Sequence, residues 1–272
     1  GQHVSKSMDD LVKEAEGLVK KGVKEVMLIA QELTYYGLDI YKKRMLGDLM
    51  NRLADVKGLE WIRLHYAYPS KFPLEVLDVM RERDNICNYL DMPLQHAANN
   101  MLKAMKRQIT REEMEELTIA IREKVPGICL RTTLIAGFPG ETEDDVEELK
   151  GFLQRQRFDR VGIFTYSHEE GTSAHDLVDD VPAEVKESRA QEIMEVQQEI
   201  SLELNQEKVG KVFKTLIDKK EAGRYLGRTE FDSVEVDNEV VIQSAKKLPI
   251  GEFVNVKITK AYDYDLEGEV VS

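Results

Sequence analysis

The sequence predicts an α/β protein in which a partial, TIM-like (β/α) barrel is followed by a small all-β, OB-like barrel. Up to about residue 166, segments with helical spacing of apolar residues alternate with apolar runs of strand length, which is typical of parallel βα sheets. After Gly210 the pattern changes to about five short segments of alternating apolar and polar residues. The predicted units are therefore 1–182 for the partial barrel, 183–209 for a connecting helix and 210–272 for the small barrel.

The partial barrel contains five predicted strands. These strands are expected at residues 26–30, 61–66, 89–94, 131–136 and 160–166. Ser7 is a suitable N-cap for a first helix, and the pairs Thr110/Glu113 and Thr142/Asp145 have the spacing of capping boxes at two later helices. Five strands cannot close an eight-stranded barrel, so we expect an incomplete barrel that lacks its first strand.

Composition excludes several classes of protein. The 272 residues include no apolar run long enough to span a membrane. No basic segment followed by an apolar one opens the chain, so we do not expect secretion. The formal net charge of −13 disfavours a protein that wraps nucleic acid. Only two cysteines are present, which indicates a reducing, cytoplasmic environment. The chain begins with Gly1 rather than Met, so we expect it to be a fragment.

Polar or glycine-rich residues follow each predicted strand, where parallel βα folds place their active sites. Residue alternation puts Arg63 and His65 on one face, and a charge directed into a barrel needs a partner or a ligand. The alternative for Arg63 is an outward-facing side chain in a buried salt bridge. The loop after the fourth strand could receive an anion, but it lacks the GK[ST] ending of a P-loop.

Familiar metal and nucleophile motifs are absent from the sequence. There is no HExxH, CxxC or GxSxG, and the five histidines have no zinc-ligand spacing. We therefore expect no metal ligands within this chain.

Four segments, taken together and in order, resemble the radical S-adenosylmethionine (SAM) methylthiotransferases. They are AQELTYYG at 30–37, PLQH at 93–96, IAGFPGETE at 135–143, and YS at 166–167 followed by EGT at 170–172. The resemblance implies a radical SAM barrel and a C-terminal TRAM domain. The QExTYYG form is similar to the branch that adds a methylthio group to the β carbon of an aspartate in a small-subunit ribosomal protein (protein twelve).

The resemblance also implies which residues hold SAM. They are Gln31 and Glu32 at the methionine amino group, Arg63, His65 and Gln95 at the ribose and carboxylate, Thr133, Gly137 and Gly140 along the adenosyl part, and Tyr166 and Ser167 beside the adenine.

The family also needs a 4Fe-4S cluster held by a CxxxCxxC loop, because cluster iron binds thiolates. Cys87 and Cys129 have a different spacing, and Cys129 is expected to be a small core residue. We expect the cluster loop to precede Gly1, so the chain as it stands should be inactive.

The charge of the C-terminal unit indicates what kind of partner it binds. From Gln206 onward there are 11 basic and 13 acidic residues, and acids cluster as Asp263, Asp265, Glu267 and Glu269. An acidic TRAM domain would complement a basic ribosomal protein, whereas an RNA-binding barrel should present a basic face. We therefore expect weak nucleic-acid binding at most, and the sequence does not identify the sulfur donor.

Three alternatives remain at this point: a tRNA adenosine methylthiotransferase, a non-catalytic binding module, and a barrel enzyme that uses Arg63, His65 and Glu141 for acid–base chemistry.

Overall fold

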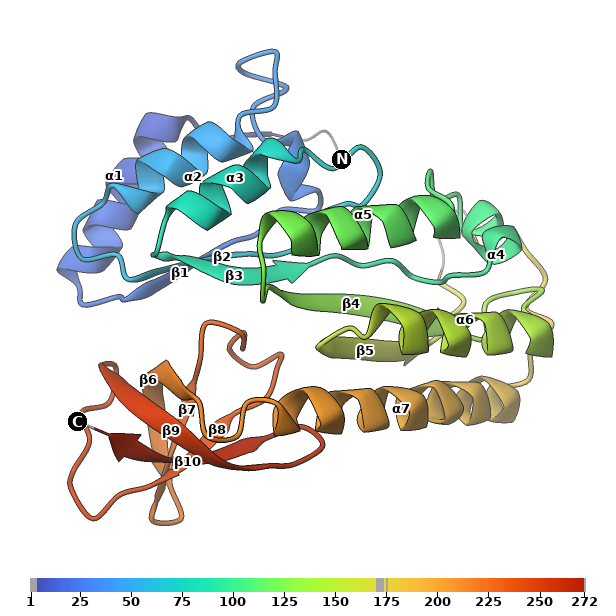
Figure 1. Cartoon of the computed structure of the whole chain (residues 1–272). Coiled ribbons are helices and arrows are strands. Elements are labelled where there is room, and N and C mark those ends of the chain that lie inside the picture. Colours follow the sequence, from blue (N-terminus) through green and yellow to red (C-terminus); the bar gives the residue numbers. More distant parts are fainter. Residues whose placement is uncertain (1–3, 170–173, 175, 272) are drawn as a thin grey trace.

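The computed structural model describes residues 4–169, 174 and 176–271 and confirms the α/β prediction. Its first unit is a parallel five-stranded sheet in which the strands follow one another in chain order (Figure 1). The strands are β1 (Glu25–Leu28), β2 (Trp61–Leu64), β3 (Ile86–Asp91), β4 (Cys129–Ala136) and β5 (Arg160–Thr165). An open parallel sheet in this order is the partial barrel that the alternation predicts.

Helices cover the outer face of the sheet. They are α1 (Met8–Lys20), α2 (Leu46–Ala54), α3 (Glu75–Glu82), α4 (Asn99–Ala104), α5 (Arg111–Lys124) and α6 (Glu143–Gln156). Figure 1 shows α1, α2, α3 and α5 on one side of the sheet and the small barrel on the other. Every second residue of β2, Ile62 and Leu64, packs with α2 residues such as Leu49 and Leu53 in one large apolar core.

The predicted caps form as expected. The Ser7 side chain accepts a hydrogen bond from the Asp10 backbone at α1. Both capping boxes are present, with Thr110 at α5 and Thr142 at α6. The third strand begins at Ile86, three residues before the predicted start. Two short elements were not predicted: the six-residue α4 and the 3-10 turn η1 (Leu33–Tyr35), which are too brief to leave a periodic signal.

A single long helix, α7 (Ala183–Gln206), leads to the second unit. That unit is a closed barrel with the strand order β10-β8-β7-β6-β9. Its strands are β6 (Val212–Glu221), β7 (Arg224–Arg228), β8 (Val240–Gln243), β9 (Phe253–Ala261) and β10 (Leu266–Val271). The change from open sheet to closed barrel supports the proposed division at 182 and 209.

The small barrel packs against the inner face of the sheet, where the strands begin. Trp61, Cys87 and Cys129, near the starts of β2, β3 and β4, form a buried apolar cluster with Leu216 and Phe253 of the small barrel. The Trp61 and Phe253 rings meet edge to face with centroids 4.7 Å apart. The carboxyl ends of the strands are left open on the same face.

No helix among the described residues is long and apolar enough to cross a membrane.

Candidate active site

A polar cavity of about 390 Å³ lies at the open, carboxyl ends of the sheet strands. Its lining combines carboxylates, guanidinium groups, amides, a hydroxyl and aromatic rings. The lining residues are Gln31, Glu32, His65, Tyr66, Ala67, Tyr68, Asp91, Pro93, Gln95, Arg107, Arg131, Thr133, Phe164 and Val236. Five residues that the sequence assigned to a site (Gln31, Glu32, His65, Gln95 and Thr133) are therefore brought together. The volume suits a small-molecule ligand.

Glu32 connects the QExTYYG segment to the cavity. Its Oε1 atom accepts hydrogen bonds from the Thr34 backbone (2.9 Å) and from the Thr34 hydroxyl (2.6 Å), so Glu32 caps the turn η1. The Tyr68 backbone also donates to it, at 3.4 Å. These bonds fix a carboxylate at the cavity wall with one oxygen satisfied by the protein.

His65, just after β2, lies in a row with Asp91 of β3 and Arg131 of β4. Asp91 Oδ1 is 2.9 Å from Arg131 Nη1, and Asp91 Oδ2 is 3.6 Å from His65 Nδ1. Burial raises the pKa of Asp91, but the hydrogen bond from His65 and the positive charge of Arg131 outweigh it, so the net pKa is lowered. Arg131 also donates to the Thr133 hydroxyl at 3.1 Å. The row presents a fixed, ionised pair to the cavity.

Two cavity residues have strained backbones. Tyr66 and Gln95 adopt φ angles of 58° and 76°, in the left-handed region that non-glycine residues rarely occupy. The Gln95 backbone is held in this conformation by hydrogen bonds with Thr133 and Ile135 on β4, at 2.9 and 2.8 Å. Strain that the surrounding structure enforces is commonly found at ligand sites, and here it fixes the direction of the Gln95 side chain.

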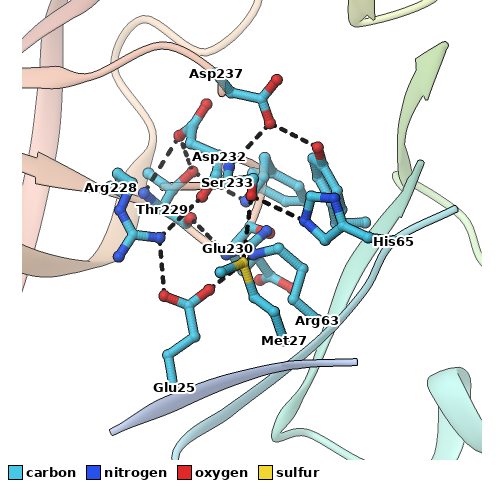
Figure 2. Close-up of polar contacts among 12 residues, drawn as sticks. Glu25, Met27, Arg63, His65, Arg228, Thr229, Glu230, Asp232, Ser233 and Asp237 are labelled. Atoms are coloured by element: carbon cyan, nitrogen blue, oxygen red, sulfur yellow. Dashed lines mark hydrogen bonds and ion pairs between the residues drawn. The ribbon is translucent and has the colours of Figure 1, made fainter. Parts of the chain in front are cut away.

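Arg63 lies outside the cavity lining, under the small barrel (Figure 2). Its Nε is 2.8 Å from Glu25 Oε1, and its Nη1 donates to the Glu230 carbonyl at 2.6 Å. The guanidinium also stacks on the Tyr89 ring, 4.8 Å from the centroid. Arg63 therefore forms the buried salt bridge of the alternative interpretation, but its side chain faces the small barrel, on the same side of the sheet as His65, rather than outward.

The glycine-rich segment forms a neighbouring turn rather than part of the lining. Gly137 and Gly140 have φ angles of 76° and 80°, and Gly137 donates to Glu141 Oε1 at 2.9 Å. Glu141 Oε2 is 3.3 Å from His96 Nε2, with both side chains fully buried. Glu141 thus pairs with His96, and Arg63 with Glu25, so the arrangement does not favour the acid–base alternative.

Tyr166 and Ser167 also lie outside the lining. The Tyr166 ring packs edge to face on Phe138, with centroids 5.1 Å apart, and the Ser167 hydroxyl donates to Glu169 at 2.7 Å. The EGT segment at 170–172 falls outside the described residues.

The lining residues that sequence reasoning did not assign to the site include Asp91, Arg107, Arg131 and Val236. Strand alternation could have found Asp91 and Arg131, because they face the same side of the sheet as His65. Arg107 follows the unpredicted α4, and it stacks on the Tyr68 ring at 4.4 Å. Val236 lies in the loop between β7 and β8 of the small barrel, and no local sequence pattern predicts that this loop contacts the sheet.

Both cysteines are inaccessible. Cys87 and Cys129 are 1% exposed and lie between the sheet and the small barrel. Burial raises the pKa of Cys87 to about 12 and that of Cys129 well above its usual value. The prediction that Cys129 is a small core residue is confirmed.

Residues 1–153 match the radical SAM superfamily, and residues 209–271 match the TRAM domain. Two proteins named ribosomal protein uS12 methylthiotransferase RimO are similar. The one from Cytophaga hutchinsonii is 58% identical over 272 residues, and the one from Flavobacterium psychrophilum is 57% identical over 270 residues. These alignments cover 100% and 99% of this chain, and 62% of each relative.

The chain therefore spans less than two thirds of the length of the relatives that it matches. Among solved structures, the radical SAM enzyme coproporphyrinogen III oxidase from Escherichia coli aligns with a TM-score of 0.54 and 18% identity. That alignment covers 84% of this chain and 62% of the oxidase, and it shows the fold alone. From the superfamily match and the parallel sheet together, the chain belongs to the radical SAM superfamily and ends in a TRAM domain.

Proposed function

We propose that this chain is the SAM-binding and substrate-docking part of a methylthiotransferase that modifies ribosomal protein uS12. The reaction would add a methylthio group to the β carbon of an aspartate. The observation that carries the proposal is the polar cavity at the strand ends, in a chain 52–58% identical to proteins named for that activity. The expected setting is the cytoplasm, where ribosomal proteins are found.

The donor set of the cavity suits SAM. SAM carries a sulfonium, an ammonium and a carboxylate, and the cavity offers the carboxylates of Glu32 and Asp91 and the guanidinium groups of Arg107 and Arg131. The Gln95 amide and the Thr133 hydroxyl can bond the ribose or the adenine edge. When bound, SAM and an iron–sulfur cluster supply the radical chemistry, whereas the protein positions the reactants.

The residues of this chain do not suit a 4Fe-4S cluster. Cluster iron needs exposed thiolates, and the thiols of Cys87 and Cys129 are buried under the small barrel with raised pKa values. We therefore propose that the chain alone is inactive. Iron and acid-labile sulfide should be absent from the purified chain, and their presence at stoichiometric levels would refute this part of the proposal.

Calorimetric titration with SAM tests the cavity. Thr133→Val removes one hydroxyl from the lining, and it should weaken binding about fivefold, the effect of one hydrogen bond of about 1 kcal/mol. The control is Thr165→Val, at the exposed end of β5 and outside the lining. Saturable binding that only Thr133→Val weakens supports the proposal, whereas a wild-type chain that binds no SAM would contradict it.

The TRAM domain is proposed to dock the basic uS12 substrate through the hairpin that joins β9 and β10. Asp265 and Glu269 are exposed there. Several other acids of the domain are used internally, because Asp218 pairs with Arg228 and Asp232 with Arg160. Asp265 and Glu269 therefore remain as exposed acids on this hairpin.

A double variant, Asp265→Lys with Glu269→Lys, should weaken the binding of uS12 at low salt at least tenfold. Glu221→Lys, on the exposed β6–β7 hairpin, is the matched control. Tighter binding of tRNA than of uS12 by the wild-type chain would favour tRNA as the substrate instead.

A further inference from the structure

The loop between β7 and β8 leaves the small barrel and lies against the inner face of the sheet (Figure 2). It comprises residues 229–239. Thr229, Asp232 and Ser233 are all at least 98% buried, although they belong to a loop. Within the loop, the Asp232 carboxylate accepts a hydrogen bond from the Thr229 hydroxyl at 2.7 Å and pairs with Arg160 of β5 at 2.8 Å. The loop is therefore anchored on the sheet.

Two residues of this loop bond directly to residues that line the cavity. Ser233 Oγ lies 2.9 Å from His65 Nε2, and Asp237 Oδ1 lies 3.3 Å from Arg131 Nε. The second oxygen of Asp237 accepts from the Tyr89 hydroxyl at 2.7 Å and from the Ser233 backbone at 2.9 Å. Figure 2 shows the bond between Ser233 of the loop and His65.

Val236 lies between these anchors and is itself part of the cavity wall. Its side chain is 50% exposed, so it adds little to the apolar core. Phe164 of β5, 60% exposed, lines the same cavity. An apolar side chain on an anchored loop, left open at the edge of a polar cavity, has the geometry of a ligand contact.

We infer that Val236 contacts SAM, so that the TRAM domain completes the wall of the SAM cavity in addition to any role in docking. The inference rests on the proposed function, because it assigns SAM to this cavity. Ser233 and Asp237 are then positioning residues, because their bonds to His65 and Arg131 fix the loop relative to these two lining residues. A ligand in the cavity would touch both units of the chain at once.

The test titrates SAM into the full 272-residue chain carrying Val236→Trp. The larger side chain should enter the cavity and weaken binding at least tenfold. Ile250→Trp places the same bulk on another exposed loop of the TRAM domain and should leave the dissociation constant within twofold of the wild-type value. Thermal unfolding should be unchanged in both variants, since both positions are exposed.

A second measurement does not depend on added bulk. The thiol introduced by Val236→Cys should react with iodoacetamide at least fivefold more slowly in saturating SAM, whereas the thiol introduced by Ile250→Cys should be unaffected. The two native thiols are buried and give little background. If the wild-type chain binds SAM and neither Val236 variant responds, the inference fails while the proposed function stands. If the wild-type chain binds no SAM, both fail.

Discussion

Single buried residues decide how the two units of this chain meet. Arg63, with no exposed side-chain surface, bonds Glu25 beside it in the sheet and carbonyls of the small barrel. Alternation correctly placed Arg63 and His65 on one face of β2. It could not say that the small barrel covers one of them and leaves the other at a cavity, because the covering residues are more than 160 positions away.

Replacing Arg63 should be costly. Arg63→Met removes the buried donor to Glu25 Oε1 and to the Glu230 carbonyl, whereas Glu25 Oε2 keeps its pair with Arg228, and we expect a loss of about 3 kcal/mol in the free energy of unfolding. Lys214→Met removes an exposed pair with Glu60 between the same two units, and it should cost at most about 1 kcal/mol. Urea denaturation measures both, and equal costs would contradict the role given to Arg63.

The buried pair of Asp232 and Arg160 should make stability depend on pH. Burial raises the pKa of Asp232, but the charges of Arg160 and Lys208 outweigh it, so the folded pKa lies below the unfolded value of about 3.9. The pair therefore stabilises the fold above pH 4, and this contribution is lost as the pH falls through the folded pKa.

Urea denaturation between pH 3 and pH 6 tests this dependence. Wild-type stability should fall toward acid pH, and Asp232→Asn should show a shallower fall. Asp84→Asn, at an exposed position, is the control and should keep the wild-type slope. If the stability of Asp232→Asn fell with pH as steeply as that of the wild type, another group would be responsible for the pH dependence.

At the scale of elements, the predictions succeeded where a pattern repeats. In the described part of the chain, all ten strands and the longer helices carry periodicity or a cap in their own residues, as Thr110 and Thr142 illustrate. The elements that shape the site have no such repeating pattern. The turn η1 depends on one Glu32 cap, and the loop at 229–239 has its conformation set by the sheet on which it lies.

The turn after β4 offers a matched pair of glycines. A Cβ at Gly140 meets no atom within 4 Å, so Gly140→Ala should cost roughly 1 kcal/mol of backbone strain. A Cβ at Gly137 would lie 2.2 Å from Lys186 Cγ and 2.8 Å from Lys186 Cβ, on a buried side chain that pairs with Asp179. Gly137→Ala should therefore cost about 1–3 kcal/mol more. Equal losses of unfolding free energy in denaturant titrations would show that Lys186 and α7 can move to accommodate the added methyl group without destabilising the fold.

At the scale of the whole molecule, the small barrel covers the starts of the sheet strands and leaves their ends open. This arrangement accounts for the position of the cavity, and it could not be derived from the sequence of either unit alone. The formal net charge of −13 does not show that Asp232 and Asp237 of the TRAM domain pair with arginines of the sheet, or that Asp218 pairs with Arg228 within the domain.

The reactivity of the two cysteines tests whether the small barrel stays packed on the sheet. Because Cys87 and Cys129 are buried between the units, iodoacetamide at pH 8 should modify neither in the native chain and both in denaturant. Mass spectrometry of the labelled chain measures the outcome. Rapid labelling of the native protein would mean that the TRAM domain separates from the sheet in solution.

The most direct test of the account is a crystal structure of this chain grown with SAM. We expect SAM in the cavity at the strand ends, with its polar groups on Gln95, Thr133 and the Asp91–Arg131 pair and with Val236 in contact. SAM bound instead in the apolar groove between α1 and β1, or found nowhere in crystals grown at saturating concentration, would contradict the assignment of this cavity.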